Sequence, residues 1–326
     1  MTKYVILYQD GAVDELVSML MLTAMPDIAF IGTEIVNGDC LAEPTADLCA
    51  KLLNLASSST AVAVSSARGW NQFPWIYRQY ALQAALLPIV NRGGSGNHQQ
   101  LITKTGWVDQ MRRQAEQTGD DVKFTLLSLG PLTPISDGLK ANPDARDLIS
   151  EIVWMGGAYT PAGQSGPPVG NVDTGIAPGA NPNAEWNAYW DPWAVDTVWQ
   201  SGIPFVLFPL NVTNKVILTP DVLRTWFFPV AADYPVIDFA AQMYAMVAFQ
   251  AGYSFWDTVT TAYLGNPGLF TIEQMAMSID TSDDPTTQGT MTAGSGTSLS
   301  VATDVNVKGF YSYLIETLKG VSFPRS

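Results

Sequence analysis

Three carboxylate residues stand close together near the start of the chain. Asp10, Asp14 and Glu15 directly follow the apolar run 4–7, and an apolar stretch over 16–22 comes after them. This pattern indicates a buried strand that ends in a tight turn, followed by the N-terminus of a helix. Carboxylates so close repel one another unless a cation, a proton or a helix dipole compensates them. A site for a hard divalent metal is therefore the first hypothesis.

Short apolar or β-branched runs alternate with segments of helical period along the chain. The predicted strands are Tyr4–Leu7, Ala29–Val36, Val62–Val64, Phe124–Ser128, Ile152–Trp154 and Phe205–Phe208. This alternation favours an α/β fold with a mainly parallel central sheet flanked by helices, in a single domain over residues 1–326. Polar motifs follow most of the predicted strands, so we expect the active site at the C-terminal ends of the strands.

Two segments have a composition typical of loops. Residues 159–183 are rich in Gly, Pro, Asn and Ser without periodicity, which predicts a long loop over the site or a disordered insert. Residues 282–300 are rich in Thr, Ser and Gly, and we expect a surface loop or hairpin there, ahead of a C-terminal helix near 307–318.

Composition limits the classes of partner. The 326 residues are 47% hydrophobic and include 10 Trp, enough for a large core, and the net charge is −14. A charge of this sign argues against nucleic acid or an anionic membrane as a partner, and it leaves small neutral molecules and cations. The two cysteines, Cys40 and Cys49, are predicted to be free thiols in a reducing, cytoplasmic compartment, and no apolar run is long enough to span a bilayer.

A series of motifs along nearly the whole chain resembles the nucleoside hydrolases, the calcium-dependent N-ribohydrolase family. The matching segments, in chain order, are Asp10–Glu15, Gly130–Thr133, Met155–Ala158, Ala184–Pro192 and Tyr253–Asp257. The likeness is greatest to the purine-preferring branch, through the Glu-Trp-Asn and Trp-Asp pairs. The resemblance implies hydrolysis of the N-glycosidic bond of purine ribonucleosides to free base and ribose.

The resemblance also assigns the catalytic centre. It implies that Ca²⁺ holds a water near the ribose C1′ and that Asp14 takes the proton of that water. Its metal ligands would be Asp10, Glu15, Asp257 and the main-chain carbonyl of Leu129. All of these are oxygen donors, which Ca²⁺ prefers, whereas one His and two Cys could not build a site.

Sugar and base contacts follow from the same motifs. Asp39, Asn171, Glu185 and Asn187 match positions that hold the sugar hydroxyls in the family, and each buried hydroxyl needs such a partner. Trp256 stands where many members have a His that serves as an acid toward the leaving base. Stacking of a purine on Trp256 would replace that acid, with Tyr77 or Trp75 on the opposite face and Trp186 nearby. We therefore expect a purine preference.

Two departures from the family pattern leave other functions open. Glu15 stands where the family usually has Asp, and Tyr8 replaces a carboxylate that commonly precedes Asp10 by two residues. The alternatives are a catalytically weakened paralogue that binds nucleosides, and a hydrolase of another ribosylated compound. The resemblance further implies a small-molecule nucleoside as the partner and a homo-oligomer, either a dimer or a tetramer.

Overall fold

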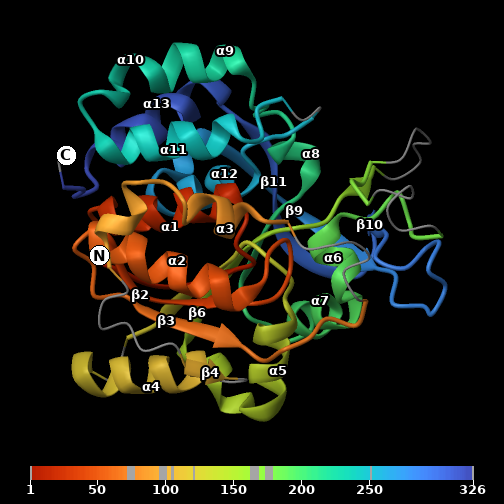
Figure 1. The fold of residues 1–326 in the computed structure, drawn as a ribbon. Coiled ribbons are helices and arrows are strands. Elements are labelled where there is room, and N and C mark those ends of the chain that lie inside the picture. Colours follow the sequence, from red (N-terminus) through yellow and green to blue (C-terminus); the bar gives the residue numbers. More distant parts are fainter. Residues whose placement is uncertain are drawn as a thin grey trace.

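The computed structural model describes residues 2–71, 78–94, 101–103, 106–119, 122–161, 169–172, 179–249 and 252–324 (Figure 1). These residues form an 11-stranded sheet with the order β4-β3-β2-β1-β5-β6-β8-β11-β9-β10-β7. The strands are β1 (Lys3–Gln9), β2 (Ile28–Ile35), β3 (Ala61–Ser65), β4 (Leu101–Thr103), β5 (Phe124–Ser128), β6 (Ile149–Met155), β7 (Tyr159–Thr160), β8 (Phe205–Phe208), β9 (Phe270–Ile279), β10 (Met291–Ala293) and β11 (Thr297–Val305).

The α/β fold predicted from the sequence is confirmed. All six predicted strands are present, as β1, β2, β3, β5, β6 and β8, and neighbouring strands from β4 to β11 pair in parallel. Residues 282–287 are exposed and lie outside strands, as expected for a surface loop, and the consecutive antiparallel strands β9 and β10 flank them as in a hairpin. The prediction missed that the segment also contains the start of β11, which pairs antiparallel with β9 on its other side.

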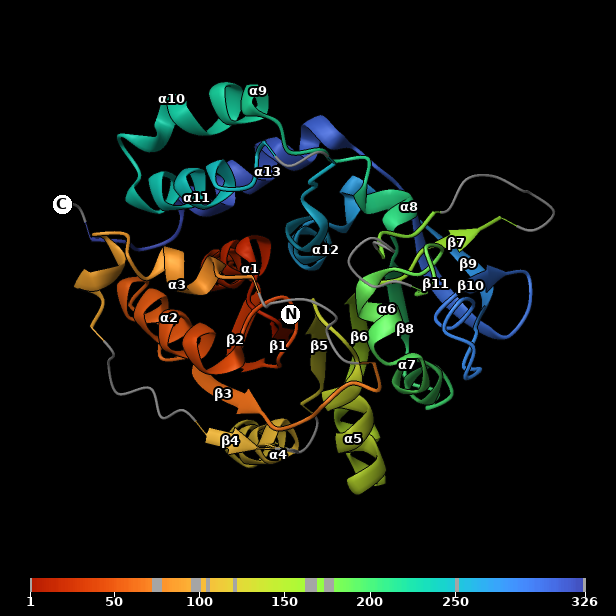
Figure 2. The ribbon, with the colours of Figure 1, turned by 45° about the vertical axis from the view of Figure 1, so that its right-hand side comes forward.

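Helices cover the sheet on two faces (Figure 2). One hydrophobic core joins the sheet to α1 (Val13–Ala24), α2 (Ala42–Leu55), α11 (Pro235–Ala245), α12 (Trp256–Gly265) and α13 (Val307–Lys319). A second core lies on the other face, under α4 (Gly106–Thr118), α5 (Thr133–Ala141) and α7 (Pro192–Trp199). The shorter helices are α3 (Tyr80–Ala84), α6 (Trp186–Trp190), α8 (Leu210–Thr213), α9 (Pro220–Val222) and α10 (Phe228–Ala231).

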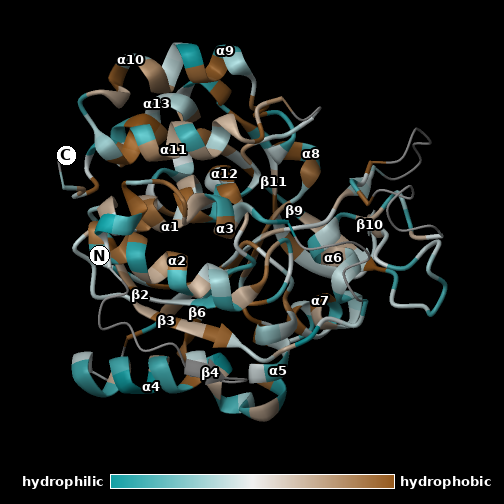
Figure 3. Ribbon diagram, in the orientation of Figure 1, coloured by the Kyte–Doolittle hydropathy of each residue, from teal (hydrophilic) through white to brown (hydrophobic). Residues whose placement is uncertain are grey.

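Helix α1 and helix α4 show how the sequence sets these layers. Residues 13–22 of α1 are all buried, because the helix lies between the sheet and α11 to α13; most of them are apolar, and the acids of its first turn, Asp14 and Glu15, are the exceptions that need a partner. Helix α4 buries only Trp107, Val108, Met111 and Ala115 and is otherwise hydrophilic, as its mostly teal ribbon shows (Figure 3). Helix α4 therefore forms an outer surface, and α1 forms part of the interior.

Strand order reverses at β1, which lies between β2 and β5. In open α/β sheets, loops on the two sides of such a point turn in opposite directions and leave a crevice at the carboxyl ends of the strands. Residues that follow β1, β2 and β5 are thereby brought together.

Both cysteines are free and buried, in agreement with the sequence-based prediction. Within the described ranges, no helix combines the length and the apolar character that crossing a bilayer requires.

Candidate functional site

Carboxylates from four segments meet at the carboxyl edge of the sheet. Asp10 follows β1 and Asp39 follows β2, while Asp14 and Glu15 lie in the first turn of α1. Asp257 lies in the first turn of α12, which packs directly on α1. The residues predicted from the sequence as metal ligands therefore come from distant parts of the chain to one place, beside the buried Leu129 that follows β5.

The loop after β2 lies tightly against Asp10. The Asp39 N–H donates to Asp10 Oδ2 at 3.0 Å, and the Cys40 N–H donates to the Asp10 carbonyl at 2.9 Å. A Cβ atom on Gly38 would stand 2.2 Å from Asp10 Oδ2, so only glycine allows this approach. The loop fixes both the main chain and the carboxylate of Asp10.

Glu15 and Asp257 carry buried oxygens without hydrogen bonds. Glu15 Oε2 and Asp257 Oδ1 have no partner among the described residues. Burial raises the pKa of both carboxyls well above their ordinary values, and the charges of neighbouring acids, Asp10 and Asp39 among them, raise each pKa further. Burial also raises the pKa of Asp10 to about 6. The cluster therefore needs protons or a cation to compensate its charge.

Asp14 differs from its neighbours because both of its carboxylate oxygens accept hydrogen bonds from two donors each. Oδ2 accepts from the N–H groups of Asp257 at 2.6 Å and Thr258 at 3.0 Å. Oδ1 accepts from the Thr258 hydroxyl at 2.9 Å and from the Tyr244 hydroxyl. A carboxylate offers about four acceptor positions, so none is left for a water proton. Asp14 therefore caps the N-terminus of α12, and its role as the proton acceptor stays a prediction.

The donor set suits a hard cation, although the ligands are not assembled. Among the residues that the structure describes, no three His, Cys, Asp or Glu side chains are arranged as they stand to hold a metal. Burial and the charge of Asp10 nevertheless raise the pKa of both Glu15 and Asp257, and Glu15 Oε2 and Asp257 Oδ1 have no hydrogen-bond partner among these residues. Buried carboxylates of this kind match the oxygen ligands that Ca²⁺ prefers.

The predicted ribose residues lie on neighbouring segments around α6. Glu185 caps α6 by accepting from the N–H groups of Asn187 at 2.9 Å and Ala188 at 3.2 Å, and it also accepts from Gly157 N–H at 2.7 Å. Asn187 Nδ2 donates to the Met155 carbonyl at 3.1 Å, and Asn171 Oδ1 accepts from Trp186 N–H at 3.1 Å. Burial raises the pKa of Glu185 to about 7.

Among the predicted base contacts, the structure describes Trp256 and Trp186. Trp256 is partly buried next to Asp257, and its ring lies 4.7 Å from that of Tyr253. Trp186 is partly buried, with its ring 6.0 Å from that of Tyr189. Tyr77, Trp75 and the single histidine, His98, lie outside the described residues.

Three further residues of the site escaped the sequence analysis. Tyr244 binds Asp14 across 230 residues of sequence. Arg78 forms an ion pair with Asp39, with 2.7 Å between Nη1 and Oδ2. Asn214 Oδ1 accepts from the Trp256 indole N–H at 2.7 Å. No local pattern signals these contacts, because each depends on segments that meet only in the folded chain.

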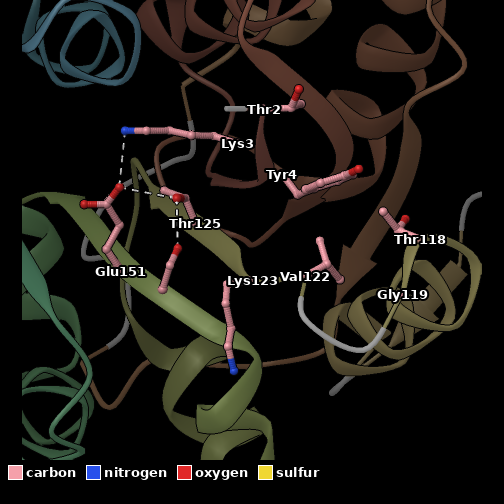
Figure 4. Close-up of a pocket in the computed structure, with 10 residues that line it drawn as sticks. Thr2, Lys3, Tyr4, Thr118, Gly119, Val122, Lys123, Thr125 and Glu151 are labelled. Carbon is pink, nitrogen blue, oxygen red and sulfur yellow. Dashed lines mark hydrogen bonds and ion pairs between the residues drawn. The ribbon is translucent and has the colours of Figure 1, made fainter.

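A separate cavity of about 610 Å³ opens at the opposite, amino-terminal edge of the sheet (Figure 4). Its polar groups largely satisfy one another. Lys3 Nζ lies 3.5 Å from Glu151 Oε1, and the Thr125 hydroxyl lies 3.4 Å from the same oxygen. It has no convergent group of carboxylates among its lining residues, so the carboxyl edge is the better candidate.

Comparisons with known proteins point to one family. The family model described as inosine-uridine preferring nucleoside hydrolase matches residues 5–312. A curated relative, the non-specific ribonucleoside hydrolase RihC of Escherichia coli O127:H6, is 33% identical over 206 residues. That match covers 60% of this chain and 60% of the length of the relative.

Solved structures match over almost the full chain. An inosine-uridine preferring nucleoside hydrolase from Bacillus anthracis is 32% identical, with a TM-score of 0.84, over 98% of this chain and 100% of that one. A purine-preferring ribonucleoside hydrolase from Gardnerella vaginalis is 22% identical, with a TM-score of 0.73, over 98% of this chain and 99% of that one. The second likeness concerns the fold alone.

Proposed function

We propose, from the premise that this chain belongs to the inosine-uridine preferring nucleoside hydrolase family, that it hydrolyses the N-glycosidic bond of ribonucleosides. The products would be a free base and ribose. The observation that carries this proposal is the meeting of Asp10, Glu15 and Asp257, with unpartnered buried oxygens, at the strand ends of the sheet. A polyhydroxylated sugar and a cation are the ligands that such a group of oxygens suits.

Asp10, Glu15, Asp257 and the Leu129 carbonyl would hold Ca²⁺. The fit rests on the orphaned oxygens of Glu15 and Asp257 and on a donor set made only of oxygen. Bound there, Ca²⁺ would neutralise the clustered charge and lower the pKa of a neighbouring water. The longer side chain of Glu15, compared with the Asp usual in the family, still supplies two carboxylate oxygens.

We assign the proton acceptor to Asp10 and keep Asp14 as the alternative. Asp10 Oδ2 accepts from the Asp39 N–H, and the carboxylate interacts with Glu15, whereas both oxygens of Asp14 are saturated by α12 and Tyr244. Asp10 would take one proton of a water while the water oxygen bonds to C1′ of the ribose. The C1′–N bond breaks in the same step, and the departing base takes a proton from solvent.

Sugar hydroxyls would be held by Asp39 and Asn187, with Glu185 and Asn171 supporting them. Glu185 and Asn171 accept hydrogen bonds from backbone N–H groups at the N-terminus of α6, so they would orient that helix as well as the substrate. A buried hydroxyl that lost its partner would cost about 1–3 kcal/mol, which gives these contacts their value for specificity.

The purine preference rests on Trp256. Stacking between a protonated purine and an indole ring stabilises the leaving base by roughly 0.5–2 kcal/mol per face. Trp186 lies on α6 as a further aromatic, and Tyr77 and Trp75 remain the predicted second face. The names of the relatives include both a non-specific and an inosine-uridine preferring hydrolase, so the preference needs direct measurement.

The test is release of free base from inosine, guanosine and uridine by the full chain in Ca²⁺, with Asp10→Asn as the inactive control. We expect base release that stops when EGTA is added, with purines faster than uridine. Nucleoside binding without turnover above that of the control would favour the weakened paralogue. If none of these nucleosides is cleaved but nucleotides or modified ribosides are, the protein is a hydrolase of another ribosylated compound. Equal rates on all three nucleosides would contradict the purine preference.

Two further expectations concern the compartment and the oligomeric state. The two buried, unpaired thiols support a reducing compartment such as the cytoplasm. The resemblance to the family supports a homo-oligomer, and light scattering would distinguish a dimer, a tetramer and a monomer.

A further inference from the structure

We propose that Arg78 is a positioning residue of this site, which holds Asp39 in the orientation that binds the sugar and whose positive charge opposes the bound cation. This inference rests on the proposed function and deepens it. It concerns a residue to which neither the family pattern nor the relatives' names assign a role, and its two parts predict opposite effects on two ligands.

Arg78 is attached to Asp39 by two contacts. The guanidinium Nη1 lies 2.7 Å from Asp39 Oδ2, and the Arg78 N–H donates to the Asp39 carbonyl at 2.9 Å. Both side chains are mostly buried, with 33% and 19% of their surface exposed. A charge-assisted contact at this depth is stronger than a surface ion pair, which solvent would weaken.

A short chain of contacts connects Arg78 to the catalytic carboxylate. The Asp39 side chain binds Arg78, and the Asp39 N–H donates to Asp10 Oδ2 at 3.0 Å. The guanidinium carbon also lies 5.9 Å from the centre of the Tyr80 ring, which opens α3. Arg78 is therefore held on two sides, and the loop that carries Asp39 is held with it.

Among the described residues, the hydrogen bond to the Asp39 carboxylate is the one from Arg78, and it uses a single oxygen, so the other is offered to a ligand in this proposal. Arg78 binds Oδ2, so a ribose hydroxyl would donate to Oδ1. Without Arg78, the Asp39 side chain would rotate more freely, and substrate binding would bear the cost of ordering it. Removal of Arg78 should therefore raise KM more than it lowers kcat.

Charge gives the second and opposite effect. Arg78 is a cation that lies one residue away from Asp10, through Asp39, and a positive charge in this position repels a divalent ion. Removal of this charge should strengthen cation binding. A residue that only stabilised the fold would weaken both ligands together, so the opposite signs identify the proposed role.

The experiment compares Arg78→Met and Arg78→Lys with a matched control, Arg112→Met. Arg112 forms an ion pair of similar length on α4, with 2.8 Å between Nη2 and Asp144 Oδ2, away from the site. The measurements are KM and kcat for inosine, and calcium affinity by titration calorimetry without substrate. Thermal unfolding confirms that each variant is folded.

For Arg78→Met we expect KM to rise about tenfold, kcat to change less than about threefold, and calcium to bind roughly threefold to tenfold more tightly. Arg78→Lys keeps the charge but not the fork of donors, so KM should rise while calcium affinity stays near that of the wild type. Arg112→Met should change neither quantity.

The outcomes separate this inference from the function on which it rests. If the wild type binds calcium and releases base, but both Arg78 variants match Arg112→Met, the inference is wrong and the function stands. Weaker calcium binding in Arg78→Met would also overturn it. If Arg78→Met does not fold, Arg78→Lys decides, since an unchanged KM in that variant contradicts the positioning role. A wild type that neither binds calcium nor releases base defeats both proposals.

Discussion

Two regions of this molecule bury acidic side chains, but one holds several acids close together and the other holds a single acid. The first is the cluster of Asp10, Glu15 and Asp257 at the carboxyl ends of the strands. The second is Glu34 on β2, whose register partner on β1 is Tyr8. Tyr8 packs on Trp107 of α4, so this pair faces the opposite side of the sheet from α1. Both regions contain carboxyl oxygens without a hydrogen-bond partner among the described residues.

Burial raises the pKa of the carboxyls in both regions, but their charge can be neutralised in different ways. Burial raises the pKa of Glu34 to about 7, and the nearby Ser65 hydroxyl lowers it in part. In the cluster, neighbouring carboxylates add to the effect of burial. One proton neutralises Glu34, whereas a group of acids in one place can be neutralised together by a divalent ion. Convergence of several acids, rather than a raised pKa alone, therefore favours the first region as the candidate site.

The largest effect should come from exchanging carboxylates of the first region for amides. We expect Asp10→Asn to lower kcat about 10²- to 10⁴-fold, because it removes the proposed proton acceptor, with little change in the unfolding temperature measured without calcium. Asp14→Asn should instead destabilise the protein by about 1–3 kcal/mol, since an amide cannot accept from all four donors. Steady-state kinetics and thermal unfolding measure both. A folded Asp14→Asn enzyme with the greater loss of kcat would return the role of base to Asp14.

Glu34 in the second region should make stability depend on pH. Its pKa is higher in the folded chain, about 7, than its ordinary value of 4.5, so the native state holds the proton more tightly. The resulting stabilisation is complete below about pH 4.5 and is lost as the pH rises through about 7. We expect Glu34→Gln to gain up to about 3 kcal/mol over the wild type between pH 5 and pH 8. Urea unfolding at several pH values tests this, and parallel curves for the two proteins would contradict it.

Calcium should distinguish the two regions. An ion at 100 times its dissociation constant stabilises the folded state by about 2.7 kcal/mol if it does not bind the unfolded chain. We expect calcium to raise the unfolding temperature of the wild type and of Glu34→Gln alike, and of Glu15→Gln much less. If Glu34→Gln loses the response and Glu15→Gln keeps it, the metal site has been assigned to the wrong region.

The smallest effect concerns the rim of the first region. Asn214→Leu removes the acceptor of the Trp256 indole N–H, which lies at an exposed position. We expect a loss of about 1 kcal/mol or less, seen as a few-fold lower rate on inosine and less change on uridine. Asn214→Asp keeps the acceptor and serves as the control. An equal loss on both nucleosides would show that the contact does not act through the base.

The parts of the fold that could be predicted are those with a strong local pattern. The buried parallel strands β1, β5 and β8 are continuous apolar runs, so they stand out in the sequence. Strands β9, β10 and β11 did not stand out, because β9 alternates buried and exposed residues weakly and β10 is only 3 residues long. Their pairing gives them order that their own residues do not specify.

The site divides in the same way. The sequence by itself determined which acids belong together, since Asp10, Glu15 and Asp257 fall in motifs that resemble a family and Asp39 matches one of its positions. Only the tertiary structure decided the surroundings of each acid: it placed Asp14 at the N-terminus of α12, left one oxygen of Glu15 and one of Asp257 without a partner among the described residues, and brought Arg78 to Asp39. The physical reason is that the role of a carboxylate depends on how many donors reach its oxygens. Those donors come from residues as much as 244 positions away in the chain.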